Sequence, residues 1–258
     1  MKKTSLFVVL MLITVIGAGT ASFAACTDTT LTKAPGVWGI ESYGSAPGGL
    51  QNILMQVTFG SNGSFTGTEF RSVAGSLSTF AISGTWAMGT PASNCQGTMT
   101  VTNPPTQTFN FALDNAGKGG NIVQIDAGYT QAGFMVAQLT IAKGCSTALV
   151  KNKKFSLYSN GQITGLGNVT GTGELKFDGI GGITAVPSVT LDLGAAGNLV
   201  LPATGTYTIN ADCTGTGTLT PTGLGSSFNI DSVVVNGGKE IMWIVTNNGE
   251  NVTGYMLQ

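Results

Sequence analysis

The sequence contains no histidine, few charged residues and no long apolar run after its N-terminal segment. Without histidine the chain cannot form a Ser-His-Asp triad, a Cys-His dyad or an imidazole metal site. Charged residues make up 9% of the chain and give a net charge of −1, whereas ordinary domains carry about 25%. Nucleic acid is therefore not an expected partner. No later apolar run approaches the length of a membrane span, so no transmembrane helix is predicted.

Motifs for cofactors and metals are also missing. There is no calcium-binding loop, no phosphate-binding glycine loop followed by a helix, and no Cys-x-x-Cys pair. The twelve carboxylates are scattered, and only Glu41, Glu69 and Asp126 lie beside apolar strand segments. We therefore expect no catalytic residues, no metal ligands and no cofactors. The alternative is an isomerase or hydrolase that uses carboxylates in a barrel cavity.

The first 24 residues have the pattern of a secretory signal peptide. Lys2 and Lys3 precede the apolar run 6–16, and the small residues Ser22 and Ala24 occupy the two positions that a signal peptidase reads for cleavage after Ala24. Removing this segment leaves nine basic and twelve acidic residues, a net charge of −3. The protein is predicted to be secreted or periplasmic. The alternative is a lipid anchor on Cys26, because residues 23–26 loosely match a bacterial lipobox.

The 39 glycines and 36 threonines belong to an internal repeat rather than to low-complexity sequence. Blocks of similar residues recur in the same order in two halves. We interpret the halves as β repeats of residues 25–141 and 142–258. In chain order the matching blocks are Ser83–Trp86 with Thr204–Tyr207, Cys95–Thr100 with Cys213–Thr218, Phe109–Phe111 with Phe228–Ile230, Gly119–Gly120 with Gly237–Gly238, Ile122 with Ile241, and Gly133–Met135 with Gly254–Met256.

Nearly every segment reads as a strand. Phe109, Phe111 and Leu113 alternate with smaller or polar residues, as do Val189, Leu191 and Leu193. Asn62-Gly63 and Asn160-Gly161 are typical of hairpin turns, prolines are expected at turns or edges, and 139–150 is a weak helical candidate. The fold class is all-β: two tandem antiparallel meander repeats, each closed as a small β-barrel. β-Sandwiches are the alternative. In the first repeat the strands are expected at 37–43, 53–60, 64–70, 79–88, 96–102, 107–114, 121–127 and 131–138.

The segment Gly205–Thr216 and the later stretch Asn236–Ile241 resemble a block found in uncharacterised secreted Gly/Thr-rich β proteins of bacteria. The resemblance covers mainly the last 60 residues and their echo at 83–138. It implies a calycin-like barrel, similar to lipocalins or allene oxide cyclase, and it supplies no catalytic residue.

The four cysteines, Cys26, Cys95, Cys145 and Cys213, follow the repeat. Cys95 and Cys213 are equivalent positions, and each is preceded by another cysteine at almost the same separation. The repeat therefore predicts the disulfides Cys26–Cys95 and Cys145–Cys213, since export permits disulfide formation.

Aromatic residues are the best candidates for ligand binding. Trp38, Trp86, Tyr207 and Trp243 are predicted to line a barrel mouth or a sugar-stacking face. Trp86 and Tyr207 are more simply explained as equivalent core residues that close each barrel. Asn110 and Asn229 point either outward or into a cavity. The leading functional hypothesis is a non-enzymatic barrel that binds a small apolar or carbohydrate ligand or acts at the cell surface, with an outer-membrane barrel as a further alternative. The oligomeric state is left open.

Overall fold

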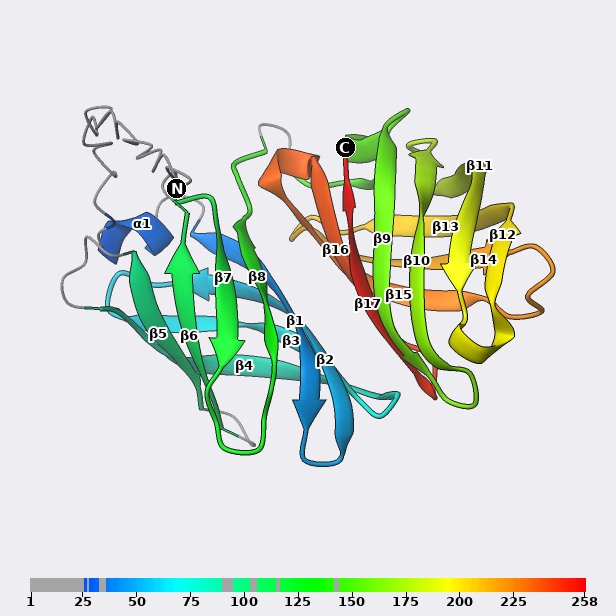
Figure 1. The fold of residues 1–258 in the computed structure, drawn as a ribbon. Helices are drawn as coiled ribbons and strands as arrows, with labels where there is room; N and C mark the ends of the chain where they lie inside the picture. The colour runs from blue at the N-terminus through cyan, green and yellow to red at the C-terminus, as the bar shows by residue number, and fades with distance from the viewer. Residues whose placement is uncertain are drawn as a thin grey trace, which may run out of the picture.

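The protein folds as two eight-stranded antiparallel β-barrels in tandem (Figure 1). The structure is a computed structural model and describes residues 26, 28–32, 36–89, 95–102, 106–114, 117–141 and 144–258. The expected signal peptide and the expected repeat boundary at 141–142 thus lie wholly or partly outside the described residues. Closed barrels agree with the predicted fold class and exclude the sandwich alternative.

Barrel 1 is a meander whose first and last strands pair with each other. Each strand pairs with its neighbour in sequence, and β1 pairs with β8 to close the ring. The strands follow the expected ranges closely. They are β1 (Val37–Ala46), β2 (Gly49–Phe59), β3 (Ser64–Val73), β4 (Ser76–Met88), β5 (Gln96–Val101), β6 (Gln107–Leu113), β7 (Gly119–Gln124) and β8 (Ala132–Ala137).

Barrel 2 closes in the same way through β17 and β9. Its fourth strand is broken at Pro202 into β12 and β13, which pair with opposite ends of β11. Pro187 lies in β11 opposite the break, and neither proline has an N–H to donate to a ladder. The strands are β9 (Lys154–Ile163), β10 (Gly167–Phe177), β11 (Gly182–Asp192), β12 (Asn198–Leu201), β13 (Ala203–Ile209), β14 (Thr214–Pro221), β15 (Phe228–Val235), β16 (Glu240–Val245) and β17 (Glu250–Leu257).

Some local predictions were wrong. Asn160 and Gly161 do not form a turn but pair inside β9 with β10 and β17, because strand pairing on both sides overrides the local turn preference. Pro187 lies within a strand rather than at a turn. The helical candidate at 139–150 yields only the 3₁₀-helix η2 (Thr147–Val150). The described residues also contain the 3₁₀-helices η3 (Gly194–Ala196) and η4 (Asn236–Gly238).

Equivalent glycines show why the repeat keeps this residue. Gly84 in β4 and Gly205 in β13 occupy the same repeat position. A Cβ at Gly84 would collide with the carbonyl oxygen of Thr100, and a Cβ at Gly205 would collide with that of Thr218. Both barrels therefore need a residue without a side chain where two strands approach closely.

Each barrel is capped at one end by a disulfide and a short helix. The disulfides are Cys26–Cys95, with Cα atoms 5.0 Å apart, and Cys145–Cys213, at 5.1 Å, which are the pairs that the repeat predicts. A short helix follows the first cysteine of each pair, α1 (Asp28–Thr32) in barrel 1 and η2 in barrel 2. Each inserts one fully buried side chain, Leu31 or Val150. We call this the capped end, and the opposite end the distal end.

The two barrels pack side by side through the outer faces of β1–β2 and β15–β17 (Figure 1). An apolar cluster at the contact contains Leu54 of barrel 1 and Val233, Val235, Met242 and Ile244 of barrel 2, all fully buried. The distal ends lie on the same side of the molecule, because the backbone N–H of Gly249 donates to the carbonyl oxygen of Gly75 at 2.9 Å. Burying five large apolar side chains holds the barrels together.

The contact between Phe134 and Tyr255 offers a test of this packing in solution. The rings meet edge to face across the two barrels, with centroids 5.4 Å apart. In a double-mutant cycle, Phe134→Leu and Tyr255→Leu should show a coupling of about 1 kcal/mol in urea unfolding. A control cycle pairs Phe134→Leu with Phe177→Leu, in the interior of barrel 2, and should be additive. Additivity in both cycles would contradict the packed arrangement.

Candidate functional site

The four aromatic candidates all point into the barrels. Trp38, Trp86, Tyr207 and Trp243 are each at most 7% exposed, so they do not form an open sugar-stacking face. Three of them have polar partners at the capped ends. Trp38 donates to the carbonyl oxygen of Leu31 at 3.1 Å, and Trp86 donates to those of Gly60 and Ser64. The Tyr207 hydroxyl accepts from the Gly179 N–H and donates to the Thr147 carbonyl oxygen.

Trp243 differs from the other three. It lies in β16 with 4% of its surface exposed, and its indole Nε1 has no hydrogen-bond partner among the described residues. Leaving a buried N–H unpaired costs about 1–3 kcal/mol, and most buried polar groups in folded proteins are paired. The indole N–H of Trp243 is therefore a free donor that would stabilise a bound hydrogen-bond acceptor.

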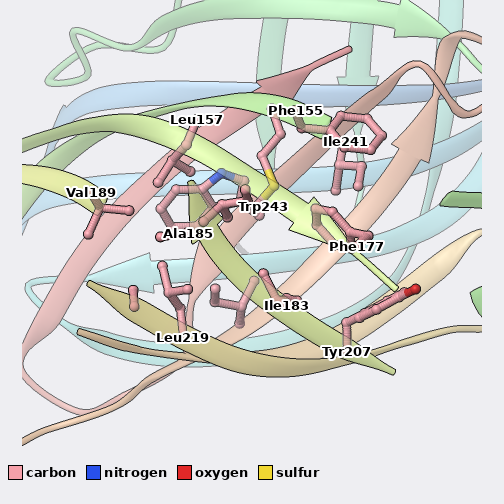
Figure 2. Packing of buried hydrophobic residues seen from close by; sticks show 14 of the residues in the cluster. Phe155, Leu157, Phe177, Ile183, Ala185, Val189, Tyr207, Leu219, Ile241 and Trp243 are labelled. Atoms are coloured by element: carbon pink, nitrogen blue, oxygen red, sulfur yellow. The ribbon is translucent and has the colours of Figure 1, made fainter. Parts of the chain in front are cut away.

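The indole borders a cavity at the distal end of barrel 2. The cavity has a volume of about 40 Å³, more than the roughly 10–15 Å³ that a single water needs. Its wall is almost entirely apolar, and Figure 2 shows two of its residues, Leu157 and Leu219, near Trp243 in the core of barrel 2. Besides Trp243 the wall contains Leu157, Ser159, Ile163, Val169, Thr170, Leu191, Leu193, Leu219, Pro221, Phe228, Ile230, Val245 and Val252.

A second, smaller cavity of about 30 Å³ lies against Tyr207. Phe177, Ile183, Ile241 and Met256 are among its lining residues. Burial raises the pKa of the Tyr207 hydroxyl, but that hydroxyl already has two partners. Tyr207 therefore has no free polar group that could bind a ligand in this second cavity.

The distal half of barrel 1 has a polar interior. Glu69 of β3, fully buried, forms an ion pair with Arg71 at 2.5 Å. Gln107 of β6 reaches across the barrel and donates to Glu69 at 3.2 Å. Nearby, Gln131 and Gln51 are hydrogen-bonded to each other. The capped half of the same barrel is apolar. The distal end of barrel 1 is thus polar, whereas the distal cavity of barrel 2 has an apolar wall.

The sequence reasoning missed these glutamines. Gln107 precedes Phe109 and Phe111 on the same strand face, and Gln124 follows Ile122 in the same way. Their alternation in step with inward-facing apolar residues indicates that they point into the barrel, but glutamine is usually exposed, which argues against burial. Asn110 and Asn229, by contrast, point outward and are exposed.

The three singled-out carboxylates lie in separate places. Glu69 is inside barrel 1. Glu41 is buried between the barrels, where burial raises its pKa to about 8, the nearby charge of Glu240 adds to the rise, and a hydrogen bond with Thr253 opposes it. Asp126 accepts from the backbone N–H of Thr108 and from Gln124. The structure thus holds each of them in its own contacts rather than as an acid–base pair.

The outer surface of barrel 1 carries a shallow hollow of about 680 Å³ over β5–β8. Its wall consists mainly of short outward side chains such as Thr98, Asn110 and Ala132, and it is open to solvent. Within the described ranges, no cluster of three or more acidic or cysteine side chains is arranged to hold a metal ion. The helices of the described part are all too short or too polar to cross a membrane.

Comparisons with known proteins identify no family. Neither a family profile nor a curated protein sequence matches the chain. Among solved structures, the chain is similar to a protein of unknown function from the DUF3598 family of Nostoc punctiforme. The identity is 11% and the TM-score 0.23, over 89% of this chain and 96% of the other. The assignment of function therefore depends on the site itself.

Proposed function

We propose that the protein is an exported ligand-binding protein whose second barrel binds a small apolar molecule carrying one hydrogen-bond acceptor. The observation that carries this proposal is the unpaired indole N–H of Trp243 beside an apolar cavity. An apolar ligand gains from leaving water, and its acceptor would satisfy the indole donor. Export is supported by the two disulfides, which are typical of oxidising compartments, and by the signal-like N-terminus.

A matched pair of ligands tests the proposal. Acetone and isobutene are small molecules of similar shape, but only the ketone accepts a hydrogen bond. We expect acetone to shift the ¹⁵N–¹H indole signal of Trp243 and to bind about fivefold more tightly than isobutene, because one neutral hydrogen bond contributes about 1 kcal/mol. NMR titration of the full chain measures both effects.

Two variants serve as controls. Trp243→Phe removes the donor and assigns its signal, and it should abolish the preference for the ketone. Trp86→Phe removes an indole whose N–H is already bonded in barrel 1 and should leave the preference unchanged. If the ketone leaves the Trp243 signal in place at millimolar concentrations, this cavity is not a ligand site.

A further inference from the structure

Both barrels hold an unpaired polar group on the strand that precedes their last strand. Gln124 lies in β7, which pairs with β8, and Trp243 lies in β16, which pairs with β17. Gln124 is 3% exposed, and its Oε1 lacks a hydrogen-bond partner among the described residues, as Trp243 Nε1 does. In barrel 2 this strand offers a donor, whereas in barrel 1 it offers an acceptor.

Two more unpaired oxygens face the same half of barrel 1. Gln107 Oε1 and Ser42 Oγ are also without partners within the described part of the chain, and their residues are at most 2% exposed. Ser42 points inward because it alternates with the core residues Trp38 and Ile40 along β1. The distal half of this barrel thus contains three buried oxygens that can each accept a hydrogen bond.

The amide groups cannot be turned to remove these acceptors. Gln107 Nε2 donates to the carboxylate of Glu69 at 3.2 Å, and Gln124 Nε2 donates to that of Asp126 at 2.9 Å. A carboxylate only accepts hydrogen bonds when it is ionised. Each amide must therefore present its nitrogen to the carboxylate, which leaves its oxygen free.

The charges in this half favour a cation. Two carboxylates, Glu69 and Asp126, lie there with one guanidinium, Arg71. That guanidinium pairs with Glu69, and the ion pairs of the described residues include none for Asp126. The half-buried carboxylate of Asp126 therefore has no cationic partner among the described residues, and a buried cation is stabilised when it is both paired and hydrogen-bonded.

We propose that the distal half of barrel 1 binds a small primary ammonium compound. Its three N–H groups and lack of acceptors match the unpaired oxygens of Ser42, Gln107 and Gln124, and its charge balances Asp126. An ammonium group is about the size of a water molecule, so its head needs the space of one buried water. The protein would then hold two different ligands in its two barrels, one polar and one apolar.

Methylammonium chloride is the probe for this site. We expect it to shift the side-chain amide signals of Gln107 and Gln124 in ¹⁵N NMR spectra of the full chain and to raise the melting temperature. Three control compounds at equal concentration separate charge from hydrogen-bond donation. They are KCl, tetramethylammonium chloride, which has no N–H, and methanol, which has no charge. None of these three should reproduce the shifts.

Variants locate the binding. Ser42→Ala removes one acceptor without touching a carboxylate and should weaken methylammonium binding about tenfold, as should Gln124→Met. Gln96→Met is the matched control, since Gln96 is exposed on the outer face of β5, and it should bind as the unaltered chain does. The Trp243 indole signal should not move, which separates this site from the cavity of barrel 2.

Each other outcome overturns the proposal. If KCl or tetramethylammonium shifts the signals as much as methylammonium does, the site recognises positive charge alone. If methanol does so, the site does not require a charge. If no probe moves the Gln107 and Gln124 signals, their oxygens are satisfied by buried water alone. A response that survives Ser42→Ala and Gln124→Met unchanged places the binding elsewhere.

Discussion

Replacing Cys145 and Cys213 together by alanine should lower the free energy of unfolding by about 4 kcal/mol. The disulfide joins residues 68 positions apart, and closing a loop of that length in the unfolded chain removes a large amount of its entropy. For a chain of this size the loss corresponds to a fall in melting temperature of roughly 10 °C. Differential scanning calorimetry measures the shift.

The equivalent pair provides the comparison. Cys26 and Cys95 close a loop of almost the same length, 69 positions, so their replacement should cost a similar amount. Hydrogen exchange should show the loss mainly in the barrel that contains the removed disulfide. Peptide mapping without reduction should find both pairs. A Cys95–Cys213 peptide, or an unchanged melting temperature in both double variants, would refute the assignment.

Raising the pH from 5 to 9 should destabilise the protein strongly because of Glu41. The folded carboxyl has a pKa of about 8, raised by burial, against 4.5 for the ordinary group. Below pH 4.5 the group is protonated in both states. Between pH 4.5 and 8 only the unfolded chain releases the proton, so stability falls by about 1.4 kcal/mol per pH unit. Above pH 8 both states are ionised and this dependence ends.

Glu41→Gln should remove that dependence and stabilise the protein by about 3 kcal/mol at pH 7, because glutamine keeps the shape without a proton to lose. Urea unfolding at pH 5, 7 and 9 gives the measurement. Glu240 and Glu250, whose pKa values are also raised by burial, should leave a smaller residual slope. Glu240→Gln, at a more exposed position, is the control and should change the slope less. If Glu41→Gln retains the full slope, Glu41 is not the group responsible.

Glu41 also contacts the strand that carries the cavity tryptophan. The Thr253 hydroxyl donates to the Trp243 carbonyl oxygen at 2.8 Å, and Thr253 is also hydrogen-bonded to Glu41. This chain links barrel 1 to the backbone of β16. The bond with Thr253 lowers the pKa of Glu41, but burial raises it by more, so the carboxyl stays protonated at neutral pH.

Local pattern was sufficient for much of the architecture. Phe109 and Phe111 alternate with outward residues, and this period of two identified β6 and its buried face. The recurrence of the cysteine blocks in the sequence predicted both disulfides, because duplicated strands place equivalent residues at equivalent points. Where local preference conflicted with pairing on both sides, as at Asn160 and Gly161, the preference lost.

The candidate sites were less predictable. Trp243 was identified from the sequence as a candidate, but so were three other aromatics whose polar atoms have partners. Gln124 was not identified at all, because nothing in a single strand shows whether a glutamine faces solvent or a barrel interior. Glu41 alternates with Trp38 and Ile40 and so points out of barrel 1, where it would be solvated if barrel 2 did not cover it.

The sequence by itself therefore determined the all-β class, the duplication and the cysteine pairs, since these depend on residue order and on a period of two. Tertiary structure alone decided which faces are buried by closure and which by docking of one barrel on the other. It also decided that the equivalent strands β16 and β7 present an indole N–H and an amide oxygen, respectively. The physical reason is that burial and hydrogen-bond partners come from strands far apart in the chain, such as β3 and β6 around Glu69 and Gln107.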